Sequence, residues 1–374
     1  MNIANFGVEE WLNQKEDAAI YDLAGSSIAS FTLEEIITID GKTTPEAFFA
    51  KLLPKKMNYG WIEGSPEFKQ EVSKLYQNMP VENILQTNGA TGANLLALYA
   101  IIEPDDHVIS MYPSYQQLYD IPKSLGADVS FWEMREDKHW ELDLSELEAL
   151  IQPNTKIICL NNANNPTGTI LNHDALRKIS QLAEQVGAYV LVDEVYQPLD
   201  PKFQIPSIVD IYDKGIATNS LSKTYSLPGV RVGWIASNHE LADLFRKYRD
   251  YTMICAGVLD DALAVHTLKN KEAVLKRNQE LVLTNLQILK NWVQQESRVS
   301  LVFPKAVSTS FIKLDIPLEI ELFCTQLLED TGVLLVPGNR FDVPKHARLG
   351  YCTPTKTLIA GLEQLSSYLK KFDD

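Results

Sequence analysis

Short apolar runs alternate with amphipathic segments through the middle of the chain. The apolar runs are typical of short strands whose two faces are both buried, and they cover residues 107–111, 129–132, 156–161, 188–193, 216–220 and 231–237. Apolar positions at helical spacing recur in residues 93–102, 145–151 and 174–185. This alternation predicts an α/β fold with a mostly parallel sheet that is sandwiched by helices.

The two ends of the chain follow a different pattern. Residues 269–295 contain no Gly or Pro and carry Val274, Leu281, Leu286 and Leu289 on one helical stripe, which predicts one long helix. Strands are expected at 309–314 and 333–336, around a helix at 319–329, and an opening helix carries Val8, Trp11 and Leu12 on one face. We therefore expect a smaller α+β domain formed by residues 1–42 and 285–374, and a large domain formed by residues 43–284.

Composition excludes several classes of protein. A length of 374 residues leaves room for two domains, and a net charge of -15 argues against binding to nucleic acid or to an anionic membrane surface. The four cysteines are scattered without zinc-site spacing, so we expect no metal and a reducing compartment. The opening residues lack the basic and apolar regions of a signal peptide, and no apolar run is long enough to span a bilayer. We expect a cytoplasmic protein.

The segment Ser220-Leu221-Ser222-Lys223, with Arg231 eight positions later, combines groups that can bind a small molecule carrying both an aldehyde and a phosphate. A lysine amine can form a Schiff base with an aldehyde, while hydroxyl groups and an arginine can hold a phosphate. Alone, a lysine is more often a solvated surface charge. The other motifs therefore decide how this segment is interpreted.

Two further segments supply groups for an anion and a flat ring. Residues 87–92 lie between a predicted strand and a helix expected to begin near Ala93, so the small residues of this segment would let backbone amides approach an anion. An ordinary strand-to-helix turn would look similar. Tyr115 follows another strand and could stack on a ring, although a tyrosine there is often a core residue.

Polar side chains also end two of the apolar runs. Asn165, at the head of an Asn-Pro-Thr-Gly turn, can donate its amide to an anionic oxygen, or it can simply form the turn. Asp193 ends an apolar strand, at the edge where ligands bind in open α/β sheets. A carboxylate there could pair with a pyridine nitrogen while Tyr196 reaches a phenolic oxygen, and the alternative is a turn cap.

Arg348 lies within an apolar strand-like run near the end of the chain. A buried guanidinium is costly without an anionic partner. The carboxylate of a substrate would serve as that partner in a two-pronged pair, and a structural salt bridge would serve equally well.

Together and in this order, the motifs resemble the fold type I pyridoxal-phosphate enzymes, and within them the class I/II aminotransferases related to aspartate aminotransferase. The resemblance runs from about Tyr59 to Arg348. It implies that Lys223 carries pyridoxal 5'-phosphate and shuttles the substrate proton, that Asp193 meets the pyridine nitrogen, and that Arg348 binds the α-carboxylate. The remaining cofactor contacts that it implies are Tyr196 and Asn165 at the phenolic oxygen, Tyr115 on the ring, and Ala90, Thr91, Ser220, Ser222 and Arg231 at the phosphate. Tyr59 would reach the phosphate of a partner subunit, which implies a homodimer with shared active sites.

The chain also departs from this family on the substrate side. Ala163 precedes the Asn165 turn where a proline is common, residues 307–309 replace a Gly-Gly pair, and residues 25–30 replace the usual N-terminal loop. The roles of Ser26, Ser27, Ser308 and Thr309 are therefore left open. Residues 10–12 and 25–27 resemble capreomycidine synthase, a cyclase that uses the same cofactor.

The resemblance favours an aminotransferase that exchanges an amino group between an amino acid and a 2-oxo acid by a ping-pong mechanism. A lyase or a cyclase would use the same residues around the cofactor. A catalytically silent sensor of the cofactor is disfavoured, because such regulators usually carry a DNA-binding module and this chain has neither room for one nor a basic arm.

Overall fold

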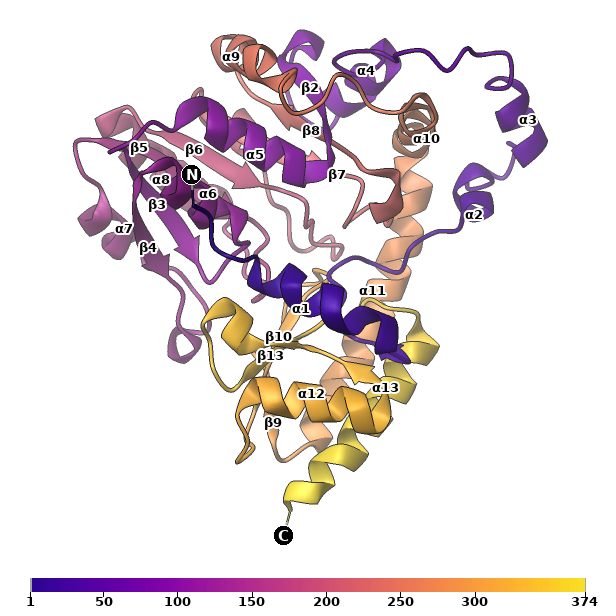
Figure 1. Cartoon of the computed structure of the whole chain (residues 1–374), viewed down its shortest axis with the longest axis vertical. Helices are drawn as coiled ribbons and strands as arrows, with labels where there is room; N and C mark the ends of the chain where they lie inside the picture. Colours follow the sequence, from indigo (N-terminus) through magenta and orange to yellow (C-terminus); the bar gives the residue numbers. More distant parts are fainter. Residues whose placement is uncertain (1, 374) are drawn as a thin grey trace.

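The computed structural model of the protein describes residues 2–373 and is built around one large sheet (Figure 1). Its strands run in the order β2-β8-β7-β6-β5-β3-β4. They are β2 (Ile84–Asn88), β3 (His107–Tyr112), β4 (Asp128–Glu133), β5 (Thr155–Asn161), β6 (Tyr189–Asp193), β7 (Gly215–Ser220) and β8 (Val232–Ala236). All neighbours pair in parallel except β8, which is antiparallel to both β2 and β7. The predicted α/β fold with a mostly parallel sheet is confirmed.

Helices cover both faces of the large sheet, which explains why its strands read as continuous apolar runs. On one face, Leu191 and Ile216 pack with α5 (Gly89–Ile101), α6 (Gln117–Leu125) and α9 (His239–Arg249). On the other face, Val190 and Ala217 join the core that includes α7 (Leu144–Leu150) and α8 (His173–Val186). Successive residues of one strand thus enter two different cores, as the pleat requires.

The two chain ends meet in a second, smaller body of structure (Figure 1). β1 (Tyr21–Asp22) pairs in parallel with β11 (Val333–Leu334), and an antiparallel sheet has the order β12-β13-β10-β9. Its strands are β9 (Val299–Ser300), β10 (Ser310–Leu314), β12 (Val336–Pro337) and β13 (His346–Leu349). The opening helix α1 (Gly7–Lys15) is anchored there, because the buried Trp11 donates from Nε1 to the Leu335 carbonyl at 2.8 Å. α12 (Ile320–Thr331) and α13 (Thr355–Leu369) complete this part.

Three predicted elements differ from the structure. The strand expected at 333–336 is divided between β11 and β12, which belong to different sheets. The long helix begins at Lys271 as α11 (Lys271–Gln295), and the preceding residues belong to a separate helix, α10 (Val258–Lys269). α5 begins at Gly89 rather than near Ala93, since Gly89 adopts a φ of +67° that starts the helix directly at the strand end.

Short helices connect α1 to the large sheet: α2 (Leu33–Ile37), α3 (Pro45–Ala50) and α4 (Pro66–Ser73). A threonine or serine caps each of these helices at its N-terminus, as in the capping box that joins Thr32 and Glu35 in α2. Within residues 2–373, no helix is long and apolar enough to cross a membrane.

Candidate active site

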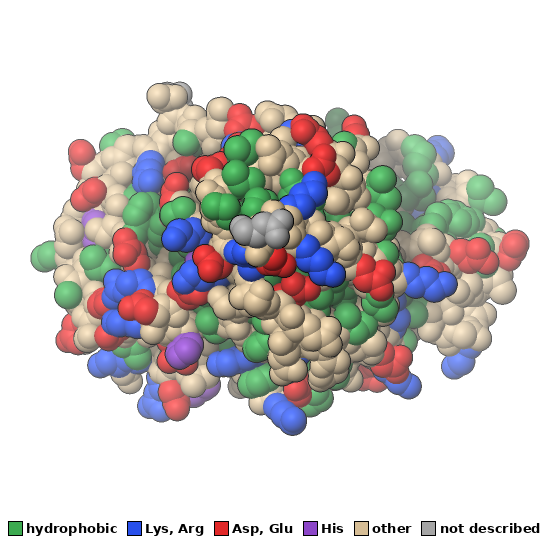
Figure 2. Space-filling model, turned by 90° about the horizontal axis from the view of Figure 1, so that it is seen from below, with side chains coloured by type: hydrophobic (Ala, Val, Ile, Leu, Met, Phe, Trp, Pro, Cys, Tyr) green, Lys and Arg blue, Asp and Glu red, His purple; other side chains and the backbone are tan. Residues whose placement is uncertain are grey.

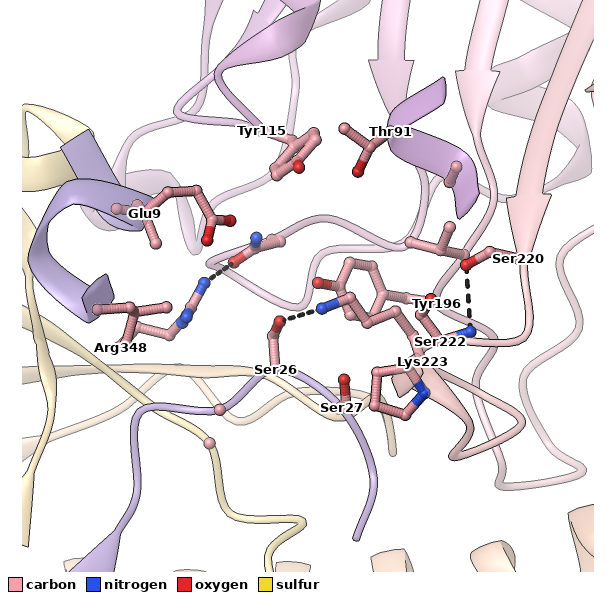
Figure 3. Close-up of a pocket in the computed structure, with 18 of the residues that line it drawn as sticks. Glu9, Ser26, Ser27, Thr91, Tyr115, Tyr196, Ser220, Ser222, Lys223 and Arg348 are labelled. Carbon is pink, nitrogen blue, oxygen red and sulfur yellow. Dashed lines mark hydrogen bonds between the residues drawn. The ribbon is translucent and has the colours of Figure 1, made fainter. Parts of the chain in front are cut away.

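A cavity of about 760 Å³ lies where the carboxyl ends of the central strands face α1 and the smaller body of structure. Eleven of the twelve predicted site residues line it: Ala90, Thr91, Tyr115, Asn165, Asp193, Tyr196, Ser220, Ser222, Lys223, Arg231 and Arg348. Figure 3 shows several of them pointing toward a common space. The twelfth, Tyr59, is 80% exposed and lies outside this cavity in the single chain.

One end of the cavity has the form of an oxyanion site. Ala90 and Thr91 lie in the first turn of α5, where backbone N–H groups have no partner within the helix and the helix dipole favours negative charge. Arg231 lies directly over this turn, because a Cβ on Gly89 would stand only 2.8 Å from Arg231 Nη2. Gly89 therefore allows the guanidinium to approach the helix N-terminus, and a phosphate would fit between them.

Asp193 is held in a fixed orientation in the centre of the cavity wall. It is 2% exposed, and its Oδ2 accepts a hydrogen bond from Asn94 Nδ2 at 2.9 Å. Thr218 Oγ1 in turn donates to Asn94 Oδ1 at 2.6 Å, which fixes the orientation of the amide. Burial raises the pKa of Asp193 to about 6, and the Asn94 hydrogen bond opposes that rise. A cationic ring nitrogen beside Asp193 would favour the carboxylate form.

Lys223 has an amine suited to nucleophilic and base chemistry near neutral pH. Its Nζ donates to Ser26 Oγ at 2.8 Å, and Ser308 Oγ fixes the Ser26 backbone by donating to its carbonyl at 2.6 Å. Burial lowers the pKa of Lys223 to about 8, and the charge of Arg348 acts in the same direction. Glu9 and Asp193 partly oppose this effect.

Arg348 is buried without an anionic partner. It is 2% exposed and donates to the Ala24 carbonyl at 2.8 and 3.2 Å and to Asn165 Oδ1 at 3.2 Å. These acceptors are neutral, and no carboxylate of residues 2–373 forms an ion pair with Arg348. The structural salt bridge that the sequence left open is thus not formed within this part of the chain.

Aromatic side chains complete the walls of the cavity. Tyr196 is 4% exposed, its ring centroid lies 5.9 Å from Lys223 Nζ, and burial raises the pKa of its hydroxyl. Tyr115 packs on Phe6 with ring centroids 5.2 Å apart, and burial raises its pKa to about 12. Both hydroxyls are therefore protonated at neutral pH and can donate hydrogen bonds.

Several functional neighbours were not predicted from the sequence. Asn94 is a fully buried amide within the apolar helix α5, and that isolated polar position was the one signal that could have indicated a buried partner. Ser26 and Ser27, whose roles were left open, both line the cavity. Thr309 Oγ1 donates to the Asn164 carbonyl at 3.3 Å and so supports the turn that carries Asn165.

Comparison with known proteins assigns this arrangement to a family. Residues 39–365 match the family described as aminotransferase class I and II. The chain belongs to this family. The prediction of an aminotransferase-class enzyme that uses pyridoxal 5'-phosphate (PLP) is confirmed by this membership.

Three relatives illustrate the range of this aminotransferase family. A PLP-dependent aminotransferase from Streptococcus suis 89-1591 is 56% identical in sequence, with all of both chains covered and a TM-score of 0.98. Capreomycidine synthase from Streptomyces vinaceus is 25% identical over 97% of this chain and 93% of that protein. The PLP-dependent cyclase OrfR is 25% identical and covers 99% of this chain and 98% of its own, with a TM-score of 0.90. The resemblance to both aminotransferases and capreomycidine synthase is confirmed.

Proposed function

We propose that the protein exchanges an amino group between an amino acid and a 2-oxo acid, in two half-reactions at the one cavity. The observation that carries this proposal is Arg348, a buried guanidinium without an anionic partner in residues 2–373, in the same cavity as the Lys223 amine. An α-carboxylate is common to amino acids and 2-oxo acids, so one arginine can receive both substrates in turn. This supports a ping-pong order.

The described residues fit PLP. When bound, this cofactor supplies an aldehyde that condenses with amines and a ring that withdraws electrons from the bonds at the substrate α-carbon. Arg231 and the first turn of α5 would hold the phosphate, with Ser220 and Ser222 beside them. Asp193 would pair with the ring nitrogen, Asn165 and Tyr196 would hold the phenolic oxygen, and Tyr115 would cover the ring.

Lys223 performs the proton transfers. Because its pKa is lowered to about 8, a substantial fraction of the amine is neutral near physiological pH and can take the proton from the substrate α-carbon. The protonated amine then holds this proton beside the substrate until it is released within the cavity. Ser26 orients the amine through the 2.8 Å hydrogen bond, and the Arg348 guanidinium fixes the substrate at the carboxylate end.

A PLP-dependent cyclase or lyase is the second candidate, supported by the likeness to capreomycidine synthase and to the cyclase OrfR. These reactions share loss of the α-proton with transamination and differ in what happens afterwards. The same set of residues around the cofactor therefore serves both candidates.

A panel of amino acids, added to the PLP-loaded protein with and without 2-oxo acids, tests the proposal. We expect the absorbance of the bound cofactor to change to that of its amine form, and a 2-oxo acid to reverse the change. Release of pyruvate and ammonia without an acceptor would identify a lyase, and a cyclic product would identify a cyclase. No reaction with any amino acid would contradict all three activities.

We also propose a homodimer whose partner completes each site. Between α3 and α4 the chain exposes large apolar side chains: Leu53, Met57, Tyr59, Trp61 and Ile62 are 56–82% exposed. Such an apolar patch is favourable when another protein surface covers it. Tyr59 lies in this patch, and we propose that it contacts the phosphate site of the partner.

Two further assignments are proposals of the same kind. We propose that residues 43–284 form the large domain and that residues 1–42 with 285–374 form the small one, which would place a boundary within α11. We propose a cytoplasmic location, which agrees with four cysteines that are all free.

A further inference from the structure

The N-terminal part of the chain lines the cavity with carboxylates. Glu9 on α1, Glu16 at the end of that helix and Asp22 on β1 all face the cavity. Glu9, Leu12 and Glu16 recur at intervals of three and four residues, which places them on one helical face. One wall of the substrate side is thus acidic.

These three carboxylates have no close ionic partner in the part of the chain that the structure describes. None of them forms an ion pair within residues 2–373, whereas the neighbouring Glu10 pairs with Arg340 at 2.9 Å. Partial burial and repulsion by Asp22, Asp17 and Glu9 raise the pKa of Glu16. Like charges that lie close together repel one another, and a ligand with a positive charge would relieve that repulsion.

The cations that line the same cavity have other partners. Arg340 lies between Glu10 and Glu321, at 2.9 and 2.6 Å from their carboxylate oxygens. Lys223 and Arg231 serve the cofactor in the proposed function, and Arg348 serves the α-carboxylate. Among the described residues that line the cavity, no other lysine or arginine is available to a second carboxylate. The cavity is therefore poorly suited to an acidic side chain.

The acidic wall lies close to the reacting groups. Figure 3 shows the Glu9 carboxylate projecting from α1 into the space between Arg348 and Tyr115. The charge of Glu9 acts on Lys223 and Arg348, and Asp22 also acts on Arg348. A substrate that is held by its α-carboxylate at Arg348 would place a long side chain within reach of these anions.

We propose that the amino acid substrate carries a cationic side chain, an ammonium or guanidinium group, which binds among Glu9, Glu16 and Asp22. This inference rests on the proposed function, because it assumes that Arg348 receives the α-carboxylate. Attraction between opposite charges supplies the discrimination.

The test compares amino acids of similar length in single-turnover reactions of the PLP-loaded protein. L-lysine, L-ornithine and L-arginine are the cationic substrates, L-norleucine is the uncharged match, and L-glutamate is the acidic one. We expect the cationic group to exceed L-norleucine in kcat/KM by on the order of 100-fold, and L-glutamate to be the poorest. The ratio of kcat/KM for L-lysine to kcat/KM for L-arginine shows whether the acidic wall prefers an ammonium or a guanidinium group.

Three neutral variants locate the effect: Glu9→Gln, Glu16→Gln and Asp22→Asn. Each is expected to lower kcat/KM for the cationic amino acids by roughly tenfold more than it lowers kcat/KM for L-norleucine. Asp17→Asn is the matched control, since it removes a neighbouring carboxylate that does not line the cavity. Calorimetric titration of L-lysine into the PLP-supplied Lys223→Ala protein measures the same loss of affinity without turnover.

The outcomes separate this inference from the proposed function. Efficient reaction with neutral or acidic amino acids and none with cationic ones would overturn the inference and leave the aminotransferase proposal intact. An equal effect of Asp17→Asn and of the three wall variants would also overturn it, because the preference would then come from the overall negative charge. Failure of every amino acid would contradict the proposed function itself.

Discussion

In the proposed function the cavity has a cofactor side and a substrate side, and the two are built in different ways. On the cofactor side, groups at the ends of buried strands are held by a chain of hydrogen bonds, such as that from Thr218 to Asn94 to Asp193. On the substrate side, α1 and the loop after β1 contribute Glu9, Glu16 and Ser26, and the two glutamates are exposed to the cavity and have no ionic partner in residues 2–373.

This difference indicates which side chains have a fixed geometry before a ligand binds and which ones can respond to the ligand. A side chain with two or three short hydrogen bonds has its geometry set before any ligand binds. Carboxylates that lack partners keep their binding capacity for the ligand. We therefore expect changes on the cofactor side to affect all substrates alike and changes on the substrate side to affect only some of them.

Lys223→Ala should produce the largest loss on the cofactor side. Removing the amine that moves the proton at the α-carbon should lower the rate of the first half-reaction by about 10⁴-fold or more, for every amino acid. The measurement is a single-turnover absorbance assay. Borohydride treatment of the wild-type protein should also attach the cofactor to the peptide that contains Lys223. The same covalent adduct at another lysine in the variant would contradict the assignment.

Asp193→Ala should follow with a loss of roughly 100- to 1000-fold, because the ring nitrogen loses its carboxylate partner. Asn94→Ala is the sharper variant, since Asn94 has a positioning role and touches only Asp193 and Thr218 in this network. Loss of the Asn94 hydrogen bond should raise the pKa of Asp193, so that as the pH is lowered the variant should lose activity at a higher pH than the wild-type protein does. An unchanged pH profile would argue against this role.

Arg348→Lys should lower kcat/KM by about 10- to 100-fold while the spectrum of the bound cofactor stays intact. The lysine keeps the charge but loses the two-pronged geometry that matches a carboxylate. The loss should be equal for L-lysine and L-norleucine, in contrast to the wall variants. A change in which side chain is preferred would place Arg348 in substrate selection and contradict its assignment to the α-carboxylate.

Mixed dimers test the surface patch that contains Tyr59. A Lys223→Ala subunit and a Tyr59→Ala subunit should each form dimers of low activity. Random mixing should then restore about a quarter of the wild-type sites, because half of the dimers are hybrids with one intact site each. Sedimentation analysis checks the assembly. A fully active monomer would exclude the shared site.

We expect the smallest effect in the pH dependence of PLP uptake. This measurement involves both sides of the cavity, because it depends on Lys223 and on the nearby charge of Glu9. Since the neutral amine of Lys223 is the nucleophile and its pKa is about 8, the rate of PLP attachment should rise with pH up to about 8 and then level off. Glu9 raises this pKa, so Glu9→Gln should move the midpoint to lower pH. Stopped-flow absorbance measures the rate. A continued rise toward the ordinary lysine pKa would contradict the perturbed value.

Much of the secondary structure in the large sheet and its helices was predictable, because it depends on the local pattern of apolar residues. A strand buried on both faces must be apolar along its length, so all six predicted strands of the sheet were found within a residue or two of their expected bounds. The side chains that we assign to the cofactor could be singled out for a related reason, because most of them lie at the end of a strand or within a few residues of it, where the sequence pattern breaks.

What the sequence alone could not decide depends on residues that are distant in the chain. The start of α5 depended on the backbone conformation of Gly89, and the division of residues 333–336 depended on which strands lay beside them. The acidic wall was likewise not predicted, since Glu9, Glu16 and Asp22 have no common motif. The sequence determined the fold class and the family, and it predicted which residues line the proposed cofactor side of the cavity, because these follow from local periodicity and from motifs at strand ends. Only the tertiary structure decided the character of the substrate side, because it arises where the first residues of the chain meet Arg348 and Lys223 in space.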